Sequence, residues 1–272
     1  NSPMQVVAYT MKTLHRLSPR VFWWHHHVPA LADPIDLSFF RRCKRYIEKT
    51  FLIPACDVFL ASSSYLSSIV SAYVNQPVQV LYPIVDEIFL EPEVTHRPHT
   101  DQLQIFLHTR LEREKNITDL IYVCQKLKSQ GIPFQCRIAG TGSYKQHLQS
   151  RVYDLPEVVF IGQISPQQVV QELDHADIYF MPSQIESFGM SAIEAAARVC
   201  QIYCYDTPAL RESLHGQGKT VFVQSKKQVV DEIAKNKISL HTKHTQMSTT
   251  MSTVQDIHTY TGFCARVSEI LG

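Results

Sequence analysis

Residues 177–198 read DIYFMPSQIESFGMSAIEAAAR, and this stretch decides the fold class. Asp177–Met181 is a short apolar segment with the length of a buried strand. Met190–Arg198 is typical of a mostly apolar helix, and a loop that holds Glu186 and Gly189 separates the two. A strand, a short loop and a helix in this order predict one βα unit of a parallel sheet.

The same alternation of apolar strands and helices continues on both sides of this unit from about residue 102. We predict six strands, at Leu103–Leu107, Cys136–Ala139, Val158–Ile161, Asp177–Met181, Gln201–Tyr205 and Val221–Gln224. The helices predicted between and after them are Asn116–Ser129, Ser143–Arg151, Ser165–Asp174, Met190–Arg198, Pro208–His215 and Lys226–Ala234. Units of this kind predict right-handed crossovers and a complete, doubly wound α/β domain.

The first 90 residues show the same pattern with fewer units. The predicted elements are, in order, a helix Met4–Leu17, a strand Val21–Trp24, a helix Leu37–Phe51, a strand Val58–Ala61, a helix Tyr65–Val74 and a strand Val78–Tyr82. Because about three strands are too few for a stable open α/β sheet, we expect this first domain to be incomplete in the chain. Its other strands would be missing or would come from another chain.

The two domains are predicted at residues 1–95 and 96–272. The proline-rich segment from Tyr82 to Pro98 is expected to connect them. The tract Ser239–Thr253 is rich in Ser, Thr, His and Met, which predicts a loop or a weak helix. A last amphipathic helix, Phe263–Leu271, is expected to follow it and to pack back.

The composition narrows the function classes. The 272 residues are 44% hydrophobic, and 26 Lys and Arg nearly balance 25 Asp and Glu, which argues against a nucleic-acid binder. The seven cysteines are scattered, as is typical of reduced thiols in a reducing compartment. No apolar run reaches the ~20 residues that span a bilayer, and the first residues do not resemble a signal peptide. We therefore expect the protein to be cytoplasmic. All nine glycines lie at or after Gly131, so the first 130 residues hold no glycine-rich phosphate loop.

Two segments that follow strands carry candidate phosphate-binding groups. His108–Asn116 follows the strand that opens the second domain, and its Arg110 and Lys115 are placed to neutralise a leaving diphosphate. The alternative is a solvated basic loop. Gly140 and Gly142 follow the next strand, where they let the backbone approach a ligand, although a tight turn alone explains them equally.

Two carboxylates, Glu186 and Glu194, lie eight residues apart in the stretch quoted first. Gly189 precedes the helix, whose first N–H groups suit an anionic or hydroxyl-rich ligand. The alternative makes Glu186 a helix cap and Glu194 a surface residue. Because Ile193 and the alanines make the helix mostly apolar, we expect Glu194 to need a partner or a ligand.

Three histidines, His25, His26 and His27, follow the predicted strand Val21–Trp24. Consecutive residues of a strand alternate between its faces, so only His25 and His27 share one, which weakens a three-histidine metal site. A histidine at the carboxyl end of such a strand is a candidate substrate contact. A packed, hydrogen-bonded histidine is the equal alternative.

In combination these motifs resemble the retaining glycosyltransferases of family 4, which have the GT-B fold with two Rossmann-like domains. The similarity runs in order from about Arg20 to the end of the chain. It rests on Val80–Asp86, Arg110 with Lys115, Gly140-Thr-Gly142, Phe160-Ile-Gly162, the Pro182–Ala195 signature with Glu186 and Glu194, and His27-Val-Pro29. The Glu-x7-Glu spacing in that signature is the most specific of these motifs.

The resemblance implies a role for each matched residue. Arg110 and Lys115 would hold the donor diphosphate, Glu194 the ribose hydroxyls, and Glu186 would face the donor sugar. His27 would lie beside the reacting sugar. The further donor-binding positions implied are Gly140, Gly142, Phe188, Gly189 and Met190. The donor would be a UDP-, GDP- or ADP-sugar, the acceptor a glycan, a lipid or another hydroxyl, and no metal or other cofactor would be required.

The sequence departs from the family pattern at Thr109 and Asn116, where glycine is common beside the clamp residues. We also expect the opening of the first, acceptor-side domain to be missing from this chain. The alternative function is therefore a non-catalytic or split nucleotide-sugar-binding subunit that needs a partner chain. A nucleotide-sugar epimerase on the same fold ranks lower, because Glu-x7-Glu with Phe188-Gly189 fits transferases better.

Peripheral membrane contact is a further hypothesis. The predicted helix Leu37–Phe51 combines basic residues with aromatic ones, a composition that docks helices onto anionic bilayers. The alternative is a solvated helix face.

Overall fold

The computed structural model describes residues 22–25, 46–91, 100–198, 201–216, 219–242 and 260–271. The chain divides into two compact units, one of residues 1–83 with 263–272 and one of residues 84–262. The boundary therefore lies before residue 95, and residues 263–272, which hold most of the last helix, group with the first unit. The predictions for Met4–Leu17 and His27 lie outside the described residues.

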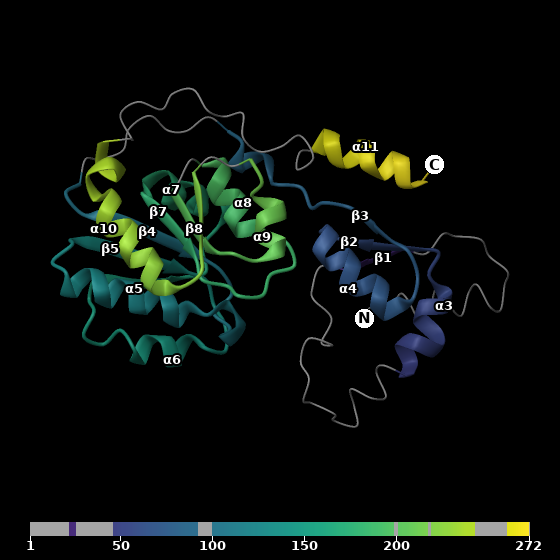
Figure 1. Ribbon diagram of the computed structural model, residues 1–272, viewed down its shortest axis with the longest axis horizontal. Helices are drawn as coiled ribbons and strands as arrows, with labels where there is room; N and C mark the ends of the chain where they lie inside the picture. Colours follow the sequence, from purple (N-terminus) through teal and green to yellow (C-terminus); the bar gives the residue numbers. More distant parts are fainter. Residues whose placement is uncertain are drawn as a thin grey trace. The chain divides into compact units, whose positions relative to one another are not determined.

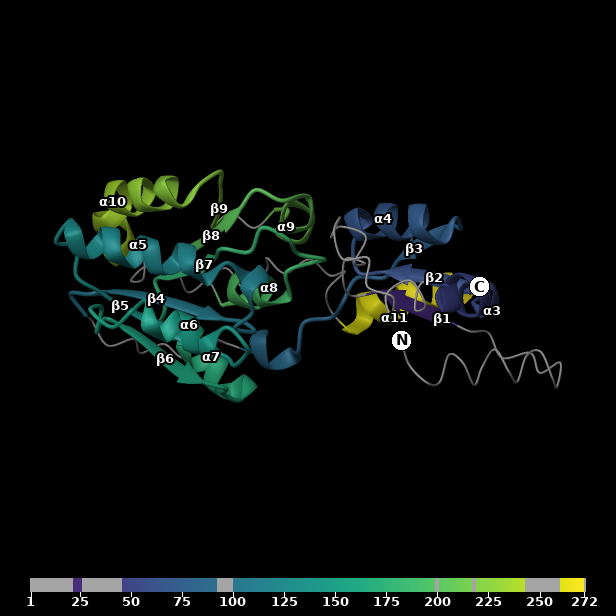
Figure 2. The ribbon, with the colours of Figure 1, turned by 90° about the horizontal axis from the view of Figure 1, so that it is seen from below.

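The larger unit is built on one six-stranded parallel sheet, shown in Figures 1 and 2. Its strands are β4 (Leu103–His108), β5 (Phe134–Ala139), β6 (Val158–Gly162), β7 (Ile178–Met181), β8 (Gln201–Tyr205) and β9 (Thr220–Val223). They lie in the order β6-β5-β4-β7-β8-β9. The first half of the sheet thus grows in one direction from β4 and the second half in the other from β7, which is the doubly wound topology predicted from the sequence.

Helices connect these strands and cover the sheet. They are α5 (Ile117–Ser129), α6 (Lys145–Ser150), α7 (Pro166–His175), α8 (Met190–Ala197), α9 (Pro208–Ser213) and α10 (Lys226–Thr242). Helices α5 and α10 lie side by side in both views. All four residues of β7 are buried, as expected of a central parallel strand covered on both faces.

Local sequence explains where several helices begin. The Ser165 side chain and Gln168 form a capping box at the start of α7, and Pro166 occupies its first turn. The Thr207 side chain caps α9 by accepting a hydrogen bond from the Leu210 amide, and Pro208 occupies the first turn. Helix α10 runs to Thr242, beyond the predicted end at Ala234, so the first part of the Ser239–Thr253 tract is helical.

The smaller unit contains a parallel sheet of three strands within the described residues, β1 (Phe22–His25), β2 (Val58–Ala61) and β3 (Val78–Val80). Helix α4 (Ser64–Val74) is capped by the Ser63 side chain and packs its buried face on the sheet. The hydrophobic core of this unit consists of buried side chains from its strands and helices, namely Trp23, Leu52, Phe59, Ala61, Leu66, Val70 and Val74. Strand β3 is shorter than predicted, although the Leu81 amide still bonds the Ala61 carbonyl.

Two helical elements of this unit differ from the prediction. The helix expected to end at Phe51 continues through a π-helical turn, η2 (Glu48–Leu52), into α3 (Ile53–Ala55), because Pro54 is tolerated in a first helical turn. The last helix, α11 (Tyr260–Leu271), starts three residues early. Phe263 of α11 lies against the Trp24 ring, with ring centroids 5.8 Å apart.

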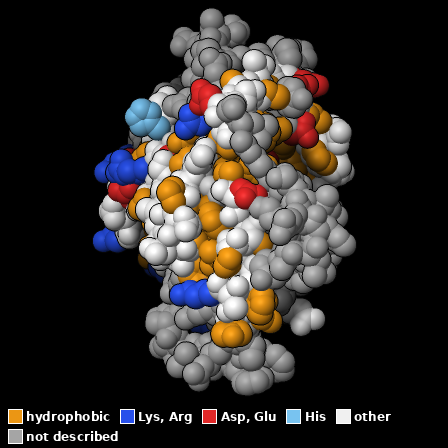
Figure 3. Space-filling model, turned by 90° about the vertical axis from the view of Figure 1, so that its right-hand side faces the viewer, with side chains coloured by type: hydrophobic (Ala, Val, Ile, Leu, Met, Phe, Trp, Pro, Cys, Tyr) orange, Lys and Arg blue, Asp and Glu red, His pale blue; other side chains and the backbone are white. Residues whose placement is uncertain are grey.

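Several large hydrophobic side chains are exposed in the described residues. Tyr46, Ile47 and Phe51 are exposed at the described end of the predicted basic and aromatic helix. Figure 3 shows hydrophobic side chains at the surface of the face drawn there. None of the helices in the described ranges is both long and apolar enough to span a membrane.

Candidate functional site

The candidate site lies at the carboxyl ends of β4 and β7 in the larger unit. These strands are neighbours in the sheet, with Ile105 paired to Ile178 and Phe106 to Tyr179. The chain leaves β4 toward one side of the sheet and β7 toward the other, which makes this position the topological switch point where open α/β sheets bind ligands. The loop with Arg110 and Lys115 therefore meets the loop with Glu186.

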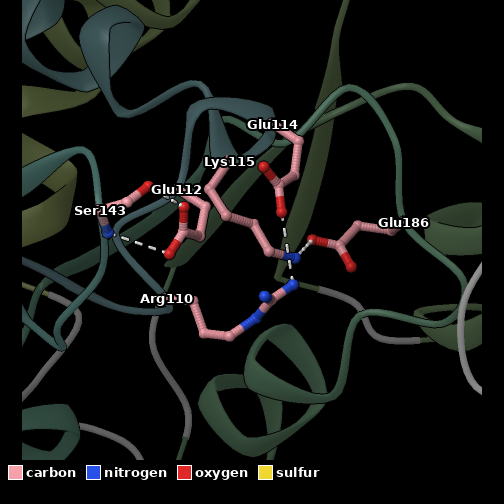
Figure 4. Close-up of polar contacts among 6 residues, drawn as sticks. All are labelled: Arg110, Glu112, Glu114, Lys115, Ser143 and Glu186. Carbon is pink, nitrogen blue, oxygen red and sulfur yellow. Dashed lines mark hydrogen bonds and ion pairs between the residues drawn. The ribbon is translucent and has the colours of Figure 1, made fainter. Parts of the chain in front are cut away.

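Lys115 and Glu186 form a close ion pair across these two loops, as Figure 4 shows. Lys115 Nζ lies 2.6 Å from Glu186 Oε1, and the side chains are 15% and 8% exposed. A pair this shielded needs both partners, because removing one leaves a buried charge without compensation. The structure thus brings the predicted cation, Lys115, into contact with the predicted carboxylate, Glu186.

Arg110 lies on the same loop but is largely solvated. Its Nη2 atom is 3.4 Å from Glu114 Oε1, and both side chains are exposed. An exposed pair of this kind contributes at most about 1 kcal/mol to stability. The Arg110 guanidinium can therefore exchange Glu114 for another anion at little cost.

Glu112 ties the loop after β4 to the loop after β5. Its carboxylate accepts hydrogen bonds from the Ser143 amide at 3.0 Å and from the Ser143 hydroxyl at 2.5 Å (Figure 4). These two hydrogen bonds lower the pKa of Glu112. Glu112 is therefore a structural anchor of the cationic loop, a role that the sequence did not reveal.

Gly140 and Gly142 allow the same two loops to approach closely. A Cβ atom on Gly140, which has φ +127°, would lie 1.9 Å from the Thr109 carbonyl oxygen. A Cβ atom on Gly142 would lie 2.3 Å from the Leu111 carbonyl oxygen. The close packing of the loop after β4 thus requires glycine at both positions. Contact of Gly140 and Gly142 with a ligand stays a prediction.

Glu194, predicted to need a partner on its apolar helix, has one in His108. The Nε2 atom of His108, the last residue of β4, lies 2.6 Å from Glu194 Oε2. Their side chains are 14% and 20% exposed. The sequence did not single out His108, although its position at the carboxyl end of the opening strand was a usable signal.

The start of α8 is shaped by Gly189. This residue has φ +91°, a backbone conformation that is unfavourable for residues with a side chain. A Cβ atom there would also lie 2.5 Å from Leu210 Cδ2, so a larger residue would clash with that side chain. As the N-cap residue, Gly189 has no side chain that could cap the helix. The amide groups of Met190 and Ser191, in the first turn, have no acceptor within the helix, and Phe188 just before Gly189 is buried.

Asn116 explains one departure from the family pattern. It adopts the left-handed conformation, with φ 51°, which asparagine tolerates better than most residues with a side chain. Its amide donates to Asp119 at 2.7 Å and to the Pro182 carbonyl at 3.2 Å. Asparagine thus supplies the backbone conformation of the usual glycine and also ties the Lys115 loop to the loop after β7.

Asp119 continues this network into the sheet. It accepts hydrogen bonds from the Tyr205 hydroxyl at 2.6 Å and from Lys226 Nζ at 2.8 Å. Burial opposes its charge, but the bonds from Lys226, Tyr205 and Asn116 outweigh burial and lower its pKa. Asp119 therefore stays ionised and holds the start of α5, directly after Lys115, in place. Sequence reasoning missed this network because its members are far apart in the chain.

The remaining predicted catalytic residue, His27, lies outside the described residues, so its role stays a prediction. Within the ranges that are described, no group of three or more His, Cys, Asp and Glu side chains is placed to hold a metal ion.

Comparisons with known proteins identify a family. The family model described as "Glycosyl transferases group 1" matches residues 91–246. Sulfoquinovosyl transferase SQD2 of Arabidopsis thaliana is 27% identical over 260 residues, which are 90% of this chain and 50% of that protein. A glycogen synthase of Mycobacterium tuberculosis is 29% identical over 133 residues, or 48% of this chain and 30% of that protein. The chain spans between about a quarter and a half of the length of the curated relatives it matches.

Solved structures identify the fold. Sucrose-phosphate synthase of Thermosynechococcus elongatus superposes with a TM-score of 0.74 at 15% identity, over 98% of this chain and 70% of that one. The pneumococcal O-GlcNAc transferase GtfA, solved with UDP and GlcNAc, gives a TM-score of 0.67 at 14% identity, over 98% of this chain and 54% of that one. At these identities the likeness establishes the fold alone, and the predicted GT-B class of α/β fold is confirmed.

Proposed function

Because the chain belongs to the family glycosyl transferases group 1, we propose that it transfers a sugar from a nucleoside-diphosphate sugar to the hydroxyl group of an acceptor. One observation carries the proposal. Lys115 meets Glu186, and His108 meets Glu194, where β4 and β7 adjoin at the switch point of the sheet. These three groups match the three parts of the donor: the Lys115 cation suits the diphosphate, the Glu186 carboxylate the sugar, and the Glu194 carboxylate the ribose.

The leaving diphosphate would be bound by Lys115 and Arg110. Negative charge grows on it as the bond to the sugar breaks, so cations fixed beside it lower the barrier. Lys115 now pairs with Glu186, and Arg110 pairs weakly with Glu114. A bound diphosphate takes the place of both carboxylates. These side-chain cations make a metal ion unnecessary, in our proposal.

Glu186 would become free to bind the donor sugar when the diphosphate replaces it as the partner of Lys115. Once the diphosphate holds Lys115, the Glu186 carboxylate is released toward the sugar, whose hydroxyl groups can donate hydrogen bonds to it. The amides at the start of α8, beside Gly189, would contact the sugar or the phosphate. Glu194 would accept hydrogen bonds from the ribose hydroxyls.

We further propose that transfer retains the configuration at the anomeric carbon, with His27 beside the reacting sugar. This rests on the resemblance of the Glu186–Glu194 signature to family 4, and on His27-Val28-Pro29. The acceptor would be a glycan, a lipid or another hydroxyl compound. Incubating the chain alone with radiolabelled UDP-, GDP- or ADP-sugars tests transfer, and NMR of the product tests its anomeric configuration. Nucleotide binding without transfer, rescued by a second protein, would favour the binding-subunit alternative.

Glu194 is expected to control nucleotide affinity. Replacing Glu194 with Ala removes a charged acceptor of ribose hydrogen bonds, so the best binder among UDP, GDP and ADP should bind roughly 10- to 100-fold more weakly. Isothermal titration measures the change. Glu232→Ala, on helix α10, is the matched control and should bind like the parent. Equal affinity in the parent and the Glu194 variant would refute the ribose assignment.

A further inference from the structure

The side chain of His108, the last residue of β4, is fixed by contacts with two aromatic rings and one carboxylate. Its ring stacks on Phe106, with centroids 5.6 Å apart and planes 20° from parallel. The edge of the Tyr179 ring packs against it at 5.5 Å. The His108 Nε2 atom faces Glu194, at 2.6 Å. The imidazole is thus held in a cluster with the Phe106 and Tyr179 rings, whose own centroids are 6.4 Å apart, and one of its nitrogens is directed at one carboxylate.

The surroundings of the other ring nitrogen decide which one carries the proton. Nδ1 of His108 is buried and has no hydrogen-bond partner among the described residues. A proton on Nδ1 would be a buried donor without an acceptor, which costs about 1–3 kcal/mol. It would also leave a lone pair on Nε2 facing the Glu194 carboxylate. The Nε2–H group therefore donates to Glu194.

The backbone of His108 is fixed as well. The Tyr179 hydroxyl donates to the His108 carbonyl at 3.2 Å, and burial raises the pKa of Tyr179 far enough to keep that hydroxyl protonated. Ser191 hydrogen-bonds the same Tyr179 side chain and lies one helical turn before Glu194. A closed ring of contacts thus links the end of β4, the middle of β7 and the first turn of α8.

We propose that His108 is a positioning residue that orients the Glu194 carboxylate and so makes the site select ribonucleotides over nucleotides without ribose hydroxyls. His108 holds Oε2, whereas no described residue bonds Oε1, which is left to accept from the ligand. This inference rests on the proposed function, because it assumes that Glu194 meets the ribose. His108 does not touch the reacting atoms and acts only through Glu194.

The test compares His108→Leu, which removes the donor, with His108→Gln, whose side-chain amide places an N–H group near the position of Nε2. His175→Leu, on the exposed end of α7, is the matched control. Three probes are titrated into each protein: the tightest binder among UDP, GDP and ADP, its 2′,3′-dideoxy counterpart, and inorganic pyrophosphate. The pyrophosphate probe reports the Lys115 region without any ribose contact.

In the parent and in His175→Leu, the ribonucleotide should bind at least about 10-fold tighter than the dideoxy nucleotide. His108→Leu should reduce that preference about 10-fold, as loss of a supporting hydrogen bond behind a binding group does. His108→Gln should keep most of it. Pyrophosphate affinity should be the same in all four proteins.

Each contrary result has a distinct meaning. A parent that binds the ribonucleotide and the dideoxy nucleotide equally would overturn the ribose role of Glu194 in the proposed function. A parent that discriminates, together with a His108→Leu variant that discriminates equally, would overturn only the role of His108. Weakened pyrophosphate binding in His108→Leu, or no rescue by His108→Gln, would also overturn it, because the loss would then follow from disturbed packing.

Discussion

Replacing Lys115 with Met is expected to slow sugar transfer by roughly 100- to 1,000-fold, the usual effect of removing one group that stabilises transition-state charge. Lys115 is the shielded cation of the site, since Arg110 on the same loop is largely solvated. Its charge should therefore contribute more than that of Arg110. Initial rates at saturating donor and acceptor measure the effect, and Arg110→Met should cost less.

The same change should destabilise the fold, because Glu186 would be left buried without its cation. Loss of one partner of such a pair costs about 3 kcal/mol or more. The double variant Lys115→Met/Glu186→Gln should recover most of that stability in urea titrations while remaining inactive. A Lys115→Met protein that transfers sugar at the parental rate would remove Lys115 from the mechanism.

Replacing Arg198 with Leu is expected to cause a large loss of stability, about 3–5 kcal/mol. The Arg198 guanidinium makes two hydrogen bonds of 2.7 Å to Asp174, and the side chains are 2% and 6% exposed. It also donates to the Glu91 carbonyl. The change would leave Asp174 charged and buried without a partner, and urea unfolding of the chain would report the loss.

Arg137→Leu is the matched control for Arg198. Arg137 also makes a two-point contact, with Glu172, but it is 42% exposed, so solvent screens the pair. Its loss should cost no more than about 1 kcal/mol. Equal losses in the two variants would show that burial does not set the contribution of these ion pairs. Neither residue is part of the proposed donor site.

The fold of the larger unit was predictable because each strand is a short apolar run beside a helix with its own boundary signals. Gln201–Tyr205 was placed to the residue, and the other strands to within one or two residues. The smaller unit was harder. A π-helical turn at Glu48–Leu52 has no periodic signature, and helix α11 begins at Tyr260, three residues before the predicted start at Phe263.

The polar residues of the candidate site that could be predicted from the sequence stand in a loop after a strand, as Lys115 and Glu186 do, or on an otherwise apolar helix, as Glu194 does. Lys115 and Glu186 could be named separately, and their meeting followed from the strand order. The pairing of His108 with Glu194 and of Tyr205 with Asp119 could not be predicted, although the place of His108 at a strand end was a usable signal, because 86 residues separate the members of each pair. Such pairs depend on the register of neighbouring strands, which one sequence does not specify residue by residue.

The most direct measurement is a crystal structure of this chain with the tightest-binding of UDP, GDP and ADP. We predict diphosphate oxygens within hydrogen-bond distance of Lys115 Nζ, Glu186 displaced from that atom, and a ribose hydroxyl that donates to Glu194. A nucleotide bound elsewhere, with Lys115 still paired to Glu186 and Glu194 touching only His108, would contradict it.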